Sequence, residues 1–322
     1  MKKVLVTAIG SFSADIVIKN LKKNKYTVMG CDIYPEEWIA DAANVSRFYH
    51  APYATSTEEY LHFIREICEK EEICMVMPLT DVEVDVLTSH REWFEEHGII
   101  LVISSAETIA LCRNKKRMQE YIDEHCPETK TIPTCWLQET EKEQVTYPLV
   151  CKPTDGRSSQ GLCYVHNEEE WKHFLQSAEG VNYIVQPYVE GKIVTVDIVR
   201  QADGKKAVAI PRMELLRTLN GAGTSVYVFQ DEALIAQSIR LAHELKIIGC
   251  VNFEFIKDNE GGYHFIECNP RFSGGVEFSC IAGYDCVSNH VRAFVGQPID
   301  DQPVYRNQYI ARKYEEYVTA VE

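Results

Sequence analysis

Hydrophobic positions follow two different patterns along this chain, and the change lies a little beyond residue 100. In the first part, short apolar runs that predict buried strands alternate with stretches of amphipathic helical spacing. The predicted strands are Lys3–Ile9, Thr27–Ile33, Cys74–Pro78 and Ile99–Ile103, and the predicted helices are Phe12–Lys23, Glu58–Lys70 and Asp81–His97. This alternation is typical of βαβ units, so we expect a parallel sheet covered by helices.

After residue 130 the apolar runs follow one another with few helices between them. The predicted strands are Tyr147–Pro153, Asn182–Val189, Ile193–Arg200, Ala207–Leu215, Thr224–Gln230, Cys250–Lys257 and Gly262–Glu267; the helices are Thr108–Cys126, Glu168–Ala178 and Asp231–Leu245. Turn sequences such as Ala202-Asp203-Gly204-Lys205 favour hairpins between neighbouring strands. We therefore expect an α+β part with largely antiparallel sheets, and we place the domain change near residue 112.

Composition limits the classes of partner. The 322 residues suggest about two domains. The formal net charge of −15, from 33 basic and 48 acidic residues, would repel a nucleic-acid backbone. A small anion such as ATP is still compatible, because a local basic pocket and Mg²⁺ reverse the sign of the field.

Targeting signals are not apparent. The apolar stretch after Met1 is too short for a signal peptide, and no run of about 18 apolar residues predicts a membrane span. The 12 cysteines show no C-x-x-C spacing, which favours reduced, buried thiols over a zinc site or disulfides. We expect a cytoplasmic protein with no membrane partner.

A dinucleotide site is the first candidate to test against the sequence. The turn after the first strand contains only Gly10, whereas the Rossmann fingerprint needs three spaced glycines for the pyrophosphate. Asp32 stands where a ribose-binding acid would be expected. One glycine and one acid leave an NAD-dependent dehydrogenase as a minor alternative.

The strongest chemical signal is the string Glu267-Cys268-Asn269-Pro270-Arg271. Residues i and i+2 of a strand face the same side, so Glu267 and Asn269 offer two oxygen ligands together, which suits Mg²⁺. Arg271 follows with a planar guanidinium suited to phosphate. Glu254 lies among apolar neighbours of the preceding strand; opposite Glu267, it would form a repelling pair that a shared cation resolves.

Two weaker signals lie upstream. Lys152 ends an apolar strand and precedes a small-residue loop with Gly156, Ser158, Ser159 and Gly161, whose N–H groups and hydroxyls can surround a phosphate. An ordinary mobile hairpin loop is an equally good interpretation. The strand that contains Gln186 breaks at Tyr188-Val189-Glu190-Gly191, where backbone groups can read an adenine edge and an acid can accept from a ribose.

The order and spacing of these pieces resemble the ATP-grasp superfamily. The likeness rests on Lys115, K-P-x-x-G-x-S-S-x-G at 152–161, Q-P-Y-V-E-G at 186–191, N-F-E-F at 252–255 and E-C-N-P-R-F-S-G-G at 267–275. Within that superfamily the chain is most similar to one ATP-grasp half of the carbamoyl-phosphate synthase large subunit and to stand-alone carboxylate–amine ligases. The resemblance implies a Rossmann-like pre-ATP-grasp domain followed by a two-subdomain ATP-grasp fold.

The resemblance also implies roles for single residues. Lys115 and Lys152 match the two nucleotide lysines, and Gly156, Ser158, Ser159 and Gly161 belong to the phosphate-covering loop. Gln186, Tyr188 and Val189 match the adenine hinge and Glu190 the ribose acid. Glu254, Glu267 and Asn269 match the Mg²⁺ (or Mn²⁺) ligands. Arg271, Lys152 and Arg212 are the catalytic candidates, with Arg217 as a competing match for Arg212.

The expected domains are residues 1–112, the ATP-grasp domain 113–300 with subdomains 113–189 and 190–300, and a short tail 301–322. The expected activity is an ATP- and Mg-dependent ligase that phosphorylates a small-molecule carboxylate and joins it to an amine. Ser11, Thr80, Asp81 and Ser273 to Gly275 are expected to shape the substrate site. A bicarbonate-activating carboxylase or carbamoyl-phosphate-type subunit and a non-catalytic ATP sensor are the alternatives, and a homodimer is an option by analogy.

Overall fold

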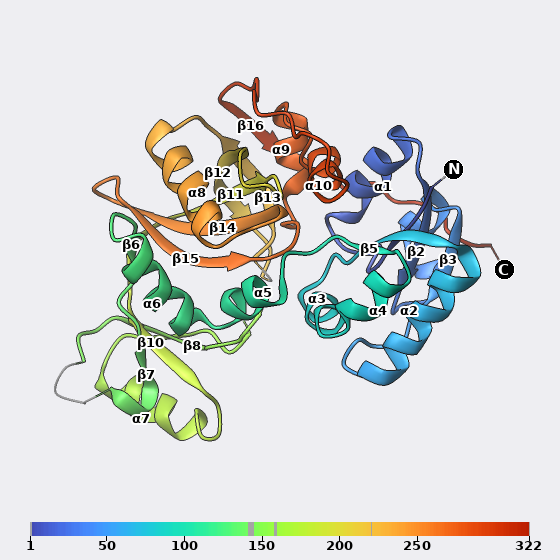
Figure 1. The fold of residues 1–322 in the computed structure, drawn as a ribbon. Coiled ribbons are helices and arrows are strands. Elements are labelled where there is room, and N and C mark those ends of the chain that lie inside the picture. The colour runs from blue at the N-terminus through green and yellow to red at the C-terminus, as the bar shows by residue number, and fades with distance from the viewer. Residues whose placement is uncertain (1, 141–144, 158–159, 220, 322) are drawn as a thin grey trace.

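The computed structural model describes residues 2–140, 145–157, 160–219 and 221–321. Within these residues the strands form sheets of five, four and seven strands (Figure 1). A parallel α/β unit comes first in the chain and mainly antiparallel sheets follow it. The predicted fold class is therefore confirmed.

The N-terminal sheet is entirely parallel and has the strand order β3-β2-β1-β4-β5. Its strands are β1 (Lys3–Val6), β2 (Thr27–Asp32), β3 (Arg47–His50), β4 (Ile73–Met77) and β5 (Ile100–Leu101); its helices are α1 (Ala14–Lys23), α2 (Thr57–Glu71), α3 (Asp81–Thr88) and α4 (Arg91–Glu96), with 3₁₀ turns at Glu36–Trp38 and Ala40–Asn44. The carboxyl ends of β1 and β4 meet at one edge of the sheet. This edge carries Ser11 and Thr80 in the loops that follow.

The four-stranded sheet has the order β7-β10-β8-β9 and is antiparallel throughout. It consists of β7 (Cys135–Trp136), β8 (Leu149–Pro153), β9 (Cys163–Val165) and β10 (Tyr183–Pro187), with α7 (Glu168–Ser177) and a 3₁₀ turn at Leu137–Glu139. Trp171 and Phe174 of α7 pack with Leu149 and Cys151 of β8 in a small core of their own. This core fixes the strand that carries Lys152.

The seven-stranded sheet has the order β16-β13-β12-β11-β14-β15-β6 and is antiparallel except where β15 meets β6. Its strands are β6 (Lys130–Thr131), β11 (Gly191–Arg200), β12 (Ala207–Arg217), β13 (Gly223–Val228), β14 (Gly249–Asp258), β15 (Tyr263–Asn269) and β16 (Gln308–Ala311); α8 (Glu232–Glu244), α9 (Val276–Ala282) and α10 (Cys286–Phe294) pack around it. Residues 308–311, which we expected in the tail, thus form its edge strand.

Two predicted helices are each interrupted once, so the expectation of single helices was wrong. The predicted helix Asp81–His97 is two helices, α3 and α4, with a break at Ser89 and His90. At the end of α3 the hydroxyls of Thr88 and Ser89 donate to backbone carbonyl groups one turn earlier. Thr108–Cys126 is α5 (Ala106–Arg113) and α6 (Lys115–His125). Between them Asn114 is extended and its side chain caps α6 by accepting from the N–H of Arg117.

The N-terminal unit and the large sheet share one hydrophobic core. Val17 and Leu21 of α1 belong to the same buried cluster as Val287 and Val291 of α10. The side chain of Asn24 also donates to the hydroxyl of Ser288 at 2.7 Å. This packing holds the carboxyl edge of the parallel sheet against β12, β14 and β15, where the cavities described below lie.

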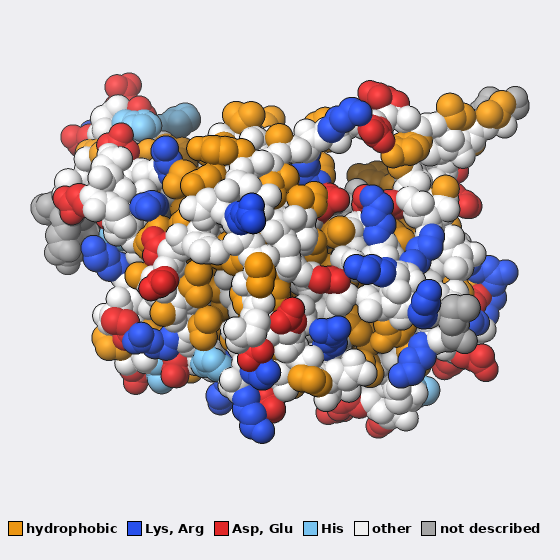
Figure 2. Space-filling model, turned by 90° about the horizontal axis from the view of Figure 1, so that it is seen from above, with side chains coloured by type: hydrophobic (Ala, Val, Ile, Leu, Met, Phe, Trp, Pro, Cys, Tyr) orange, Lys and Arg blue, Asp and Glu red, His pale blue; other side chains and the backbone are white. Residues whose placement is uncertain are grey.

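The surface bears charges of both signs. Seen from above, acidic and basic side chains are interspersed over the visible face (Figure 2). In the described part of the chain, no helix has the length and apolar character needed to cross a membrane. The C-terminal segment runs back to the N-terminal unit, where the hydroxyl of Thr319 donates to the carbonyl of Glu37.

Candidate nucleotide and substrate site

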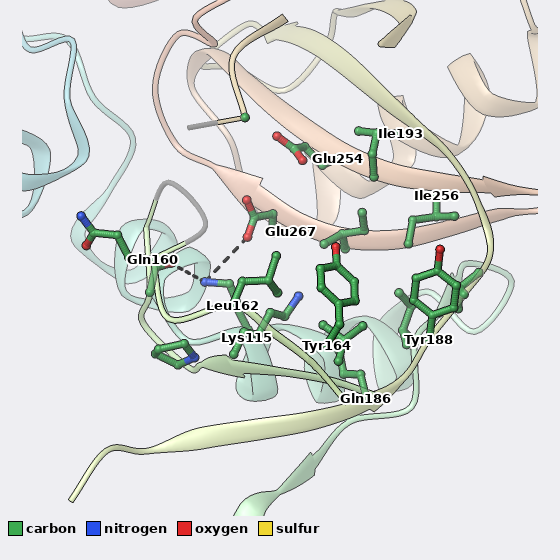
Figure 3. Close-up of a pocket in the computed structure, with 18 of the residues that line it drawn as sticks. Lys115, Gln160, Leu162, Tyr164, Gln186, Tyr188, Ile193, Glu254, Ile256 and Glu267 are labelled. Atoms are coloured by element: carbon green, nitrogen blue, oxygen red, sulfur yellow. Dashed lines mark hydrogen bonds and ion pairs between the residues drawn. The ribbon is translucent and has the colours of Figure 1, made fainter. Parts of the chain in front are cut away.

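Two adjoining cavities lie where the three sheets meet. The first, of about 310 Å³, lies between the four-stranded and seven-stranded sheets (Figure 3). The second, of about 440 Å³, lies between the large sheet and the carboxyl edge of the parallel sheet. Gln160, Arg217, Gly221, Glu254 and Glu267 line both. The predicted metal carboxylates therefore stand at the junction of the cavities.

Strand pairing brings the predicted metal ligands together. In the register of β14 and β15, Glu254 lies opposite Glu267 and Asn252 opposite Asn269. The side-chain amide of Asn269 donates to Glu267 at 3.2 Å and to Asn252 Oδ1 at 3.3 Å. Both glutamates are largely buried, with side-chain exposures of 19% for Glu254 and 26% for Glu267. The cross-strand pair inferred from the sequence is present.

Each glutamate faces a cation of the protein. Both carboxylate oxygens of Glu254 accept from Arg217 Nη2, each at 3.3 Å. Glu267 Oε2 lies 3.7 Å from Lys115 Nζ. Burial raises the pKa of Glu254; Arg217 opposes this shift and the charge of Glu267 adds to it. Burial acts in the same direction on Glu267, but Lys115 and Lys152 outweigh it and hold its pKa below the ordinary value.

The donor set at the junction fits a divalent cation with a preference for oxygen. Two carboxylates and the side-chain amide of Asn269 lie together on adjacent strands, and carboxylate and amide oxygens are ligands that suit Mg²⁺. Among the described residues, no group of three or more His, Cys, Asp or Glu side chains is close enough for a metal. A metal here would therefore depend on Asn269 and on oxygens from its ligand, as expected of an ion bound together with phosphates.

Lys115, from α6, and Lys152, from the four-stranded sheet, approach the same carboxylates. Lys115, the first residue of α6, donates from Nζ to the carbonyl of Gly156 at 2.7 Å (Figure 3). Lys152 lies on β8 opposite Ile184 and lines the first cavity. Burial lowers the pKa of Lys152 to about 8, although Glu267 acts in the opposite direction. The two lysines thus concentrate positive charge beside Glu254 and Glu267, the two carboxylates predicted to bind the metal.

The predicted phosphate loop connects β8 with β9. Gly156 lines the first cavity, whereas Ser158 and Ser159 lie outside the described residues. Gly161 has φ +70°, and a Cβ there would stand 2.8 Å from the ring of Pro153, so that this position requires glycine. Arg157 pairs with Asp85 of α3.

The predicted adenine hinge is only partly at the cavity. Gln186, Tyr188 and Val189 line it, but Glu190 is exposed and is not among the described lining residues. The amide of Gln186 donates to Thr134 Oγ1 at 2.7 Å, and the N–H of Tyr188 donates to the carbonyl of Pro148. The Tyr188 N–H is therefore already bonded within the protein.

Sequence reasoning missed the walls of this cavity. Apolar side chains from four elements and two loops form them: Ile132, Val150, Leu162, Ile193, Ile256 and Ile266, with Tyr164 beside Tyr188. Such walls form a slot for a flat apolar ring. Each residue reads as ordinary strand core in the sequence, so the only available signal was its proximity to the motifs.

The candidate arginines occupy different positions. Arg271 donates from Nη2 to Asp81 Oδ2 at 2.9 Å and lines the second cavity. Arg217 reaches the junction itself. Arg212 is fully buried, and its guanidinium contacts Asp197, Glu214, Ser273 and Ser279. Its role as a catalytic group stays a prediction, and Arg217 is the better placed of the two.

The second cavity has a mixed polar lining. The residues expected from the sequence, namely Ser11, Thr80, Asp81 and Ser273 to Gly275, all line it. Glu214 also lines it and was missed; Oε1 accepts from Thr195 and Arg212, while Oε2 has no partner among the described residues. Arg113 has a side-chain exposure of 16% and forms ion pairs with Asp81 and Asp85.

Comparison with known proteins agrees with this architecture. Residues 4–102 match the model of a PylC-like N-terminal domain, residues 119–217 that of the D-Ala D-Ala ligase C-terminus, and residues 179–317 that of an ATP-grasp protein in the biosynthetic pathway with the Ter operon.

Solved structures share the fold at low sequence identity. Biotin carboxylase from Campylobacter jejuni is 18% identical with a TM-score of 0.79, covering 96% of this chain and 74% of that chain. An N5-carboxyaminoimidazole ribonucleotide synthetase in an ADP complex is 17% identical with a TM-score of 0.78, covering 96% and 81%. L-amino acid ligase from Bacillus licheniformis is 14% identical with a TM-score of 0.74, covering 94% and 78%. The solved structures thus share the fold, and the family models match an ATP-grasp region at residues 179–317 behind a PylC-like N-terminal region at residues 4–102.

Proposed function

We propose that this protein is a Mg²⁺- and ATP-dependent ligase that converts a small-molecule carboxylate to an acyl phosphate and joins it to an amine. The observation that carries the proposal is the position of Glu254 and Glu267 at the junction of the two cavities. In such an arrangement the terminal phosphate of a nucleotide in the first cavity meets a substrate in the second. The ATP-grasp family models and the fold of solved ligases support this assignment.

ATP is the ligand that the first cavity fits. The apolar walls accept a base, and Lys115, Lys152 and the backbone of the loop around Gly156 face the polyphosphate side. Gln186, Tyr188 and Val189 complete the base end in this proposal. Among the solved structures with this fold, one contains ADP with magnesium and another contains ADP.

Glu254, Glu267 and Asn269 would hold Mg²⁺ or Mn²⁺, which would neutralise charge on the phosphate oxygens. The groups of this chain then act around the transferred phosphate. Arg271 and Lys152, with Lys115 and Arg217 nearby, offer donors that stabilise its developing negative charge. These side chains position the reactants in line, as phosphoryl transfer requires.

The chemistry proceeds in two balanced steps. A carboxylate oxygen of the substrate attacks the γ-phosphorus, and the bond to the bridging oxygen breaks to release ADP. The amine nitrogen then attacks the acyl carbon, phosphate leaves, and the nitrogen loses a proton. A shielded site is needed because water competes with the amine for the acyl phosphate.

The size of the second cavity supports an organic carboxylate rather than bicarbonate as the substrate in this proposal. A volume of about 440 Å³ with seryl, guanidinium and carboxylate groups around it exceeds what a four-atom anion requires. Bicarbonate activation therefore ranks second. A non-catalytic ATP sensor ranks third, because simple binding does not require a second lined cavity beside the carboxylate pair.

Assembly and location belong to the proposal as well. A biotin carboxylase domain with this fold from Hydrogenobacter thermophilus forms a dimer, which supports a homodimer as one option for this chain. The boundaries near residues 112, 189 and 300, the carbamoyl-phosphate synthase likeness and a cytoplasmic location are likewise our proposals.

The test is an ADP-release screen with purified protein, Mg²⁺-ATP and paired panels of carboxylates and amines. We expect ADP formation that needs both an organic acid and an amine for full rate. ADP formation with bicarbonate alone would favour the second candidate. Tight ATP binding by calorimetry without turnover under any combination would favour the sensor.

A further inference from the structure

Three arginines from three separate elements of the ATP-grasp part meet two aspartates on one helix of the N-terminal unit. Arg113 ends α5, Arg157 belongs to the loop after β8, and Arg271 follows β15. Asp81 and Asp85 stand one turn apart on α3, so both carboxylates lie on the same helix face.

Asp81 uses both carboxylate oxygens. Oδ1 accepts from Arg113 Nη1 at 2.8 Å, and Oδ2 accepts from Arg271 Nη2 at 2.9 Å and Nε at 3.3 Å. Its side chain is only 8% exposed. The two charge-assisted contacts to Oδ2 hold the guanidinium of Arg271 against α3, while Arg113 occupies the other oxygen.

Asp85 repeats the arrangement one turn later. Oδ1 accepts from Arg113 Nε at 2.6 Å, and Oδ2 accepts from Arg157 Nη2. Three guanidinium charges thus face two carboxylate charges, which leaves one positive charge in surplus. Since Arg157 and Arg271 both line the second cavity, this surplus lies beside the place where we expect the phosphate to be transferred.

We propose that α3 is a positioning element for phosphoryl transfer: Asp81 orients Arg271, and Asp85 holds Arg157 and so the base of the glycine-rich loop. Arg113, shared by both aspartates, also fixes the start of α6 and with it Lys115. The N-terminal unit then acts on the reaction through two carboxylates that need not touch the nucleotide. The effect on rate rests on the proposed ligase function.

The competing explanation is that these ion pairs only hold the two parts of the chain together. A purely structural role would lower stability and leave the reaction of the remaining folded protein unchanged. Glu71 provides the matched control. It belongs to the same α/β unit, its side chain is also 8% exposed, and it pairs with two cations, Lys3 and Arg47, away from both cavities.

The experiment compares Asp81→Asn, Asp85→Asn and Glu71→Gln in the full chain, at a temperature where circular dichroism shows each to be folded. With the substrates found by the ADP-release screen, we expect Asp81→Asn to lower kcat by about 10- to 100-fold, because Arg271 loses its fixed position, while KM for ATP changes little. Glu71→Gln is expected to lower Tm and leave kcat unchanged. Equal kcat for Asp81→Asn and Glu71→Gln would overturn the role of Asp81.

Limited trypsin digestion tests Asp85 without any substrate. Cleavage after Arg157, normalised to total cleavage, should rise by about two- to fivefold in Asp85→Asn, since a partly exposed ion pair that holds this arginine is lost. Glu71→Gln should leave that ratio unchanged. An unchanged ratio in Asp85→Asn would overturn the anchoring role. If wild-type protein released no ADP with any substrate, the proposed function would fail while this digestion still decided the inference.

Discussion

Lys152 tests most sharply whether a residue that favours ATP binding lowers the stability of the protein without ligand. Its side chain is half-buried on β8 beside the carboxylate pair, and this burial lowers its pKa from 10.5 to about 8. At neutral pH the group is still charged, so folding must keep a charge in a place that disfavours it. We therefore expect Lys152→Met to stabilise the protein without ligand while weakening ATP binding.

The magnitude follows from the pKa. A fall from 10.5 to about 8 corresponds to at most about 3 kcal/mol of free energy of unfolding lost below pH 8. Between pH 8 and 10.5 the unfolded chain holds this proton and the folded chain does not, so stability rises with pH in that window. At pH 9.5 the cost has shrunk to about 1 kcal/mol.

The assay is thermal unfolding of wild type and Lys152→Met at pH 7 and pH 9.5. We expect the variant to melt higher by about 2–6 °C at pH 7 and by less at pH 9.5. ATP affinity should fall about 10- to 100-fold, the effect of losing a charge-assisted contact to phosphate. Lys172→Met is the control, because Lys172 lies on the exposed face of α7 with a side-chain exposure of 62%.

Two results would refute the reasoning. One is a variant that melts lower than wild type at pH 7, which would mean that the ammonium group stabilises the unliganded fold. The other is a melting difference that does not depend on pH, because burial of a charge with a pKa of about 8 must produce such a dependence.

Further variants test the remaining roles. Glu254→Gln and Glu267→Gln should each raise the Mg²⁺ concentration for half-maximal ADP release about 10- to 100-fold; an unchanged Mg²⁺ titration would exclude the residue as a ligand. Arg212→Met should lower the free energy of unfolding in urea by about 3–5 kcal/mol, because Asp197 and Glu214 lose their buried partner. Arg217→Met should keep its stability and release ADP more slowly; the reverse pattern would exchange the two roles. Gly161→Ala should cost about 1–2 kcal/mol, visible as a lower Tm, because φ is positive there; an unchanged Tm would argue against this backbone geometry.

The long elements could be predicted from the sequence because local pattern determines them. The strand predicted at 193–200 is β11, which begins two residues earlier at Gly191, and the helix predicted at 231–245 is α8 at Glu232–Glu244. The short strands β3, β6, β7, β9 and β16, with two to four residues each, were missed. Such strands owe their existence to a neighbouring strand rather than to their own residues.

The site residues also fall into those that local pattern predicts and those that depend on contacts between strands or segments. Glu254, Glu267 and Asn269 were within reach of sequence reasoning because strand periodicity and one hairpin bring them together. Asn252 belongs to the same N-F-E-F motif as Glu254, yet its place opposite Asn269 depends on the exact register of the two strands. Local pattern also placed Asn114 within a helix, where its side chain instead starts a new one.

Contacts between distant segments had no signal in the sequence. Asp81 and Arg271 are 190 residues apart in the chain, and Asp85 and Arg157 are 72 apart. Glu214 sits two residues after Arg212 on a strand that read as ordinary core. Only the packing of α3 and β12 against the cavity shows that these groups face it.

Transfer of ¹⁸O from the substrate carboxylate tests the central claim most directly. The substrate identified by the ADP-release screen would be labelled in both carboxylate oxygens and turned over with unlabelled ATP in ordinary water. If an acyl phosphate forms, one labelled oxygen must appear in each inorganic phosphate released, which mass spectrometry detects. Phosphate without label, with both labelled oxygens retained in the organic product or exchanged with water, would contradict carboxylate activation at this site.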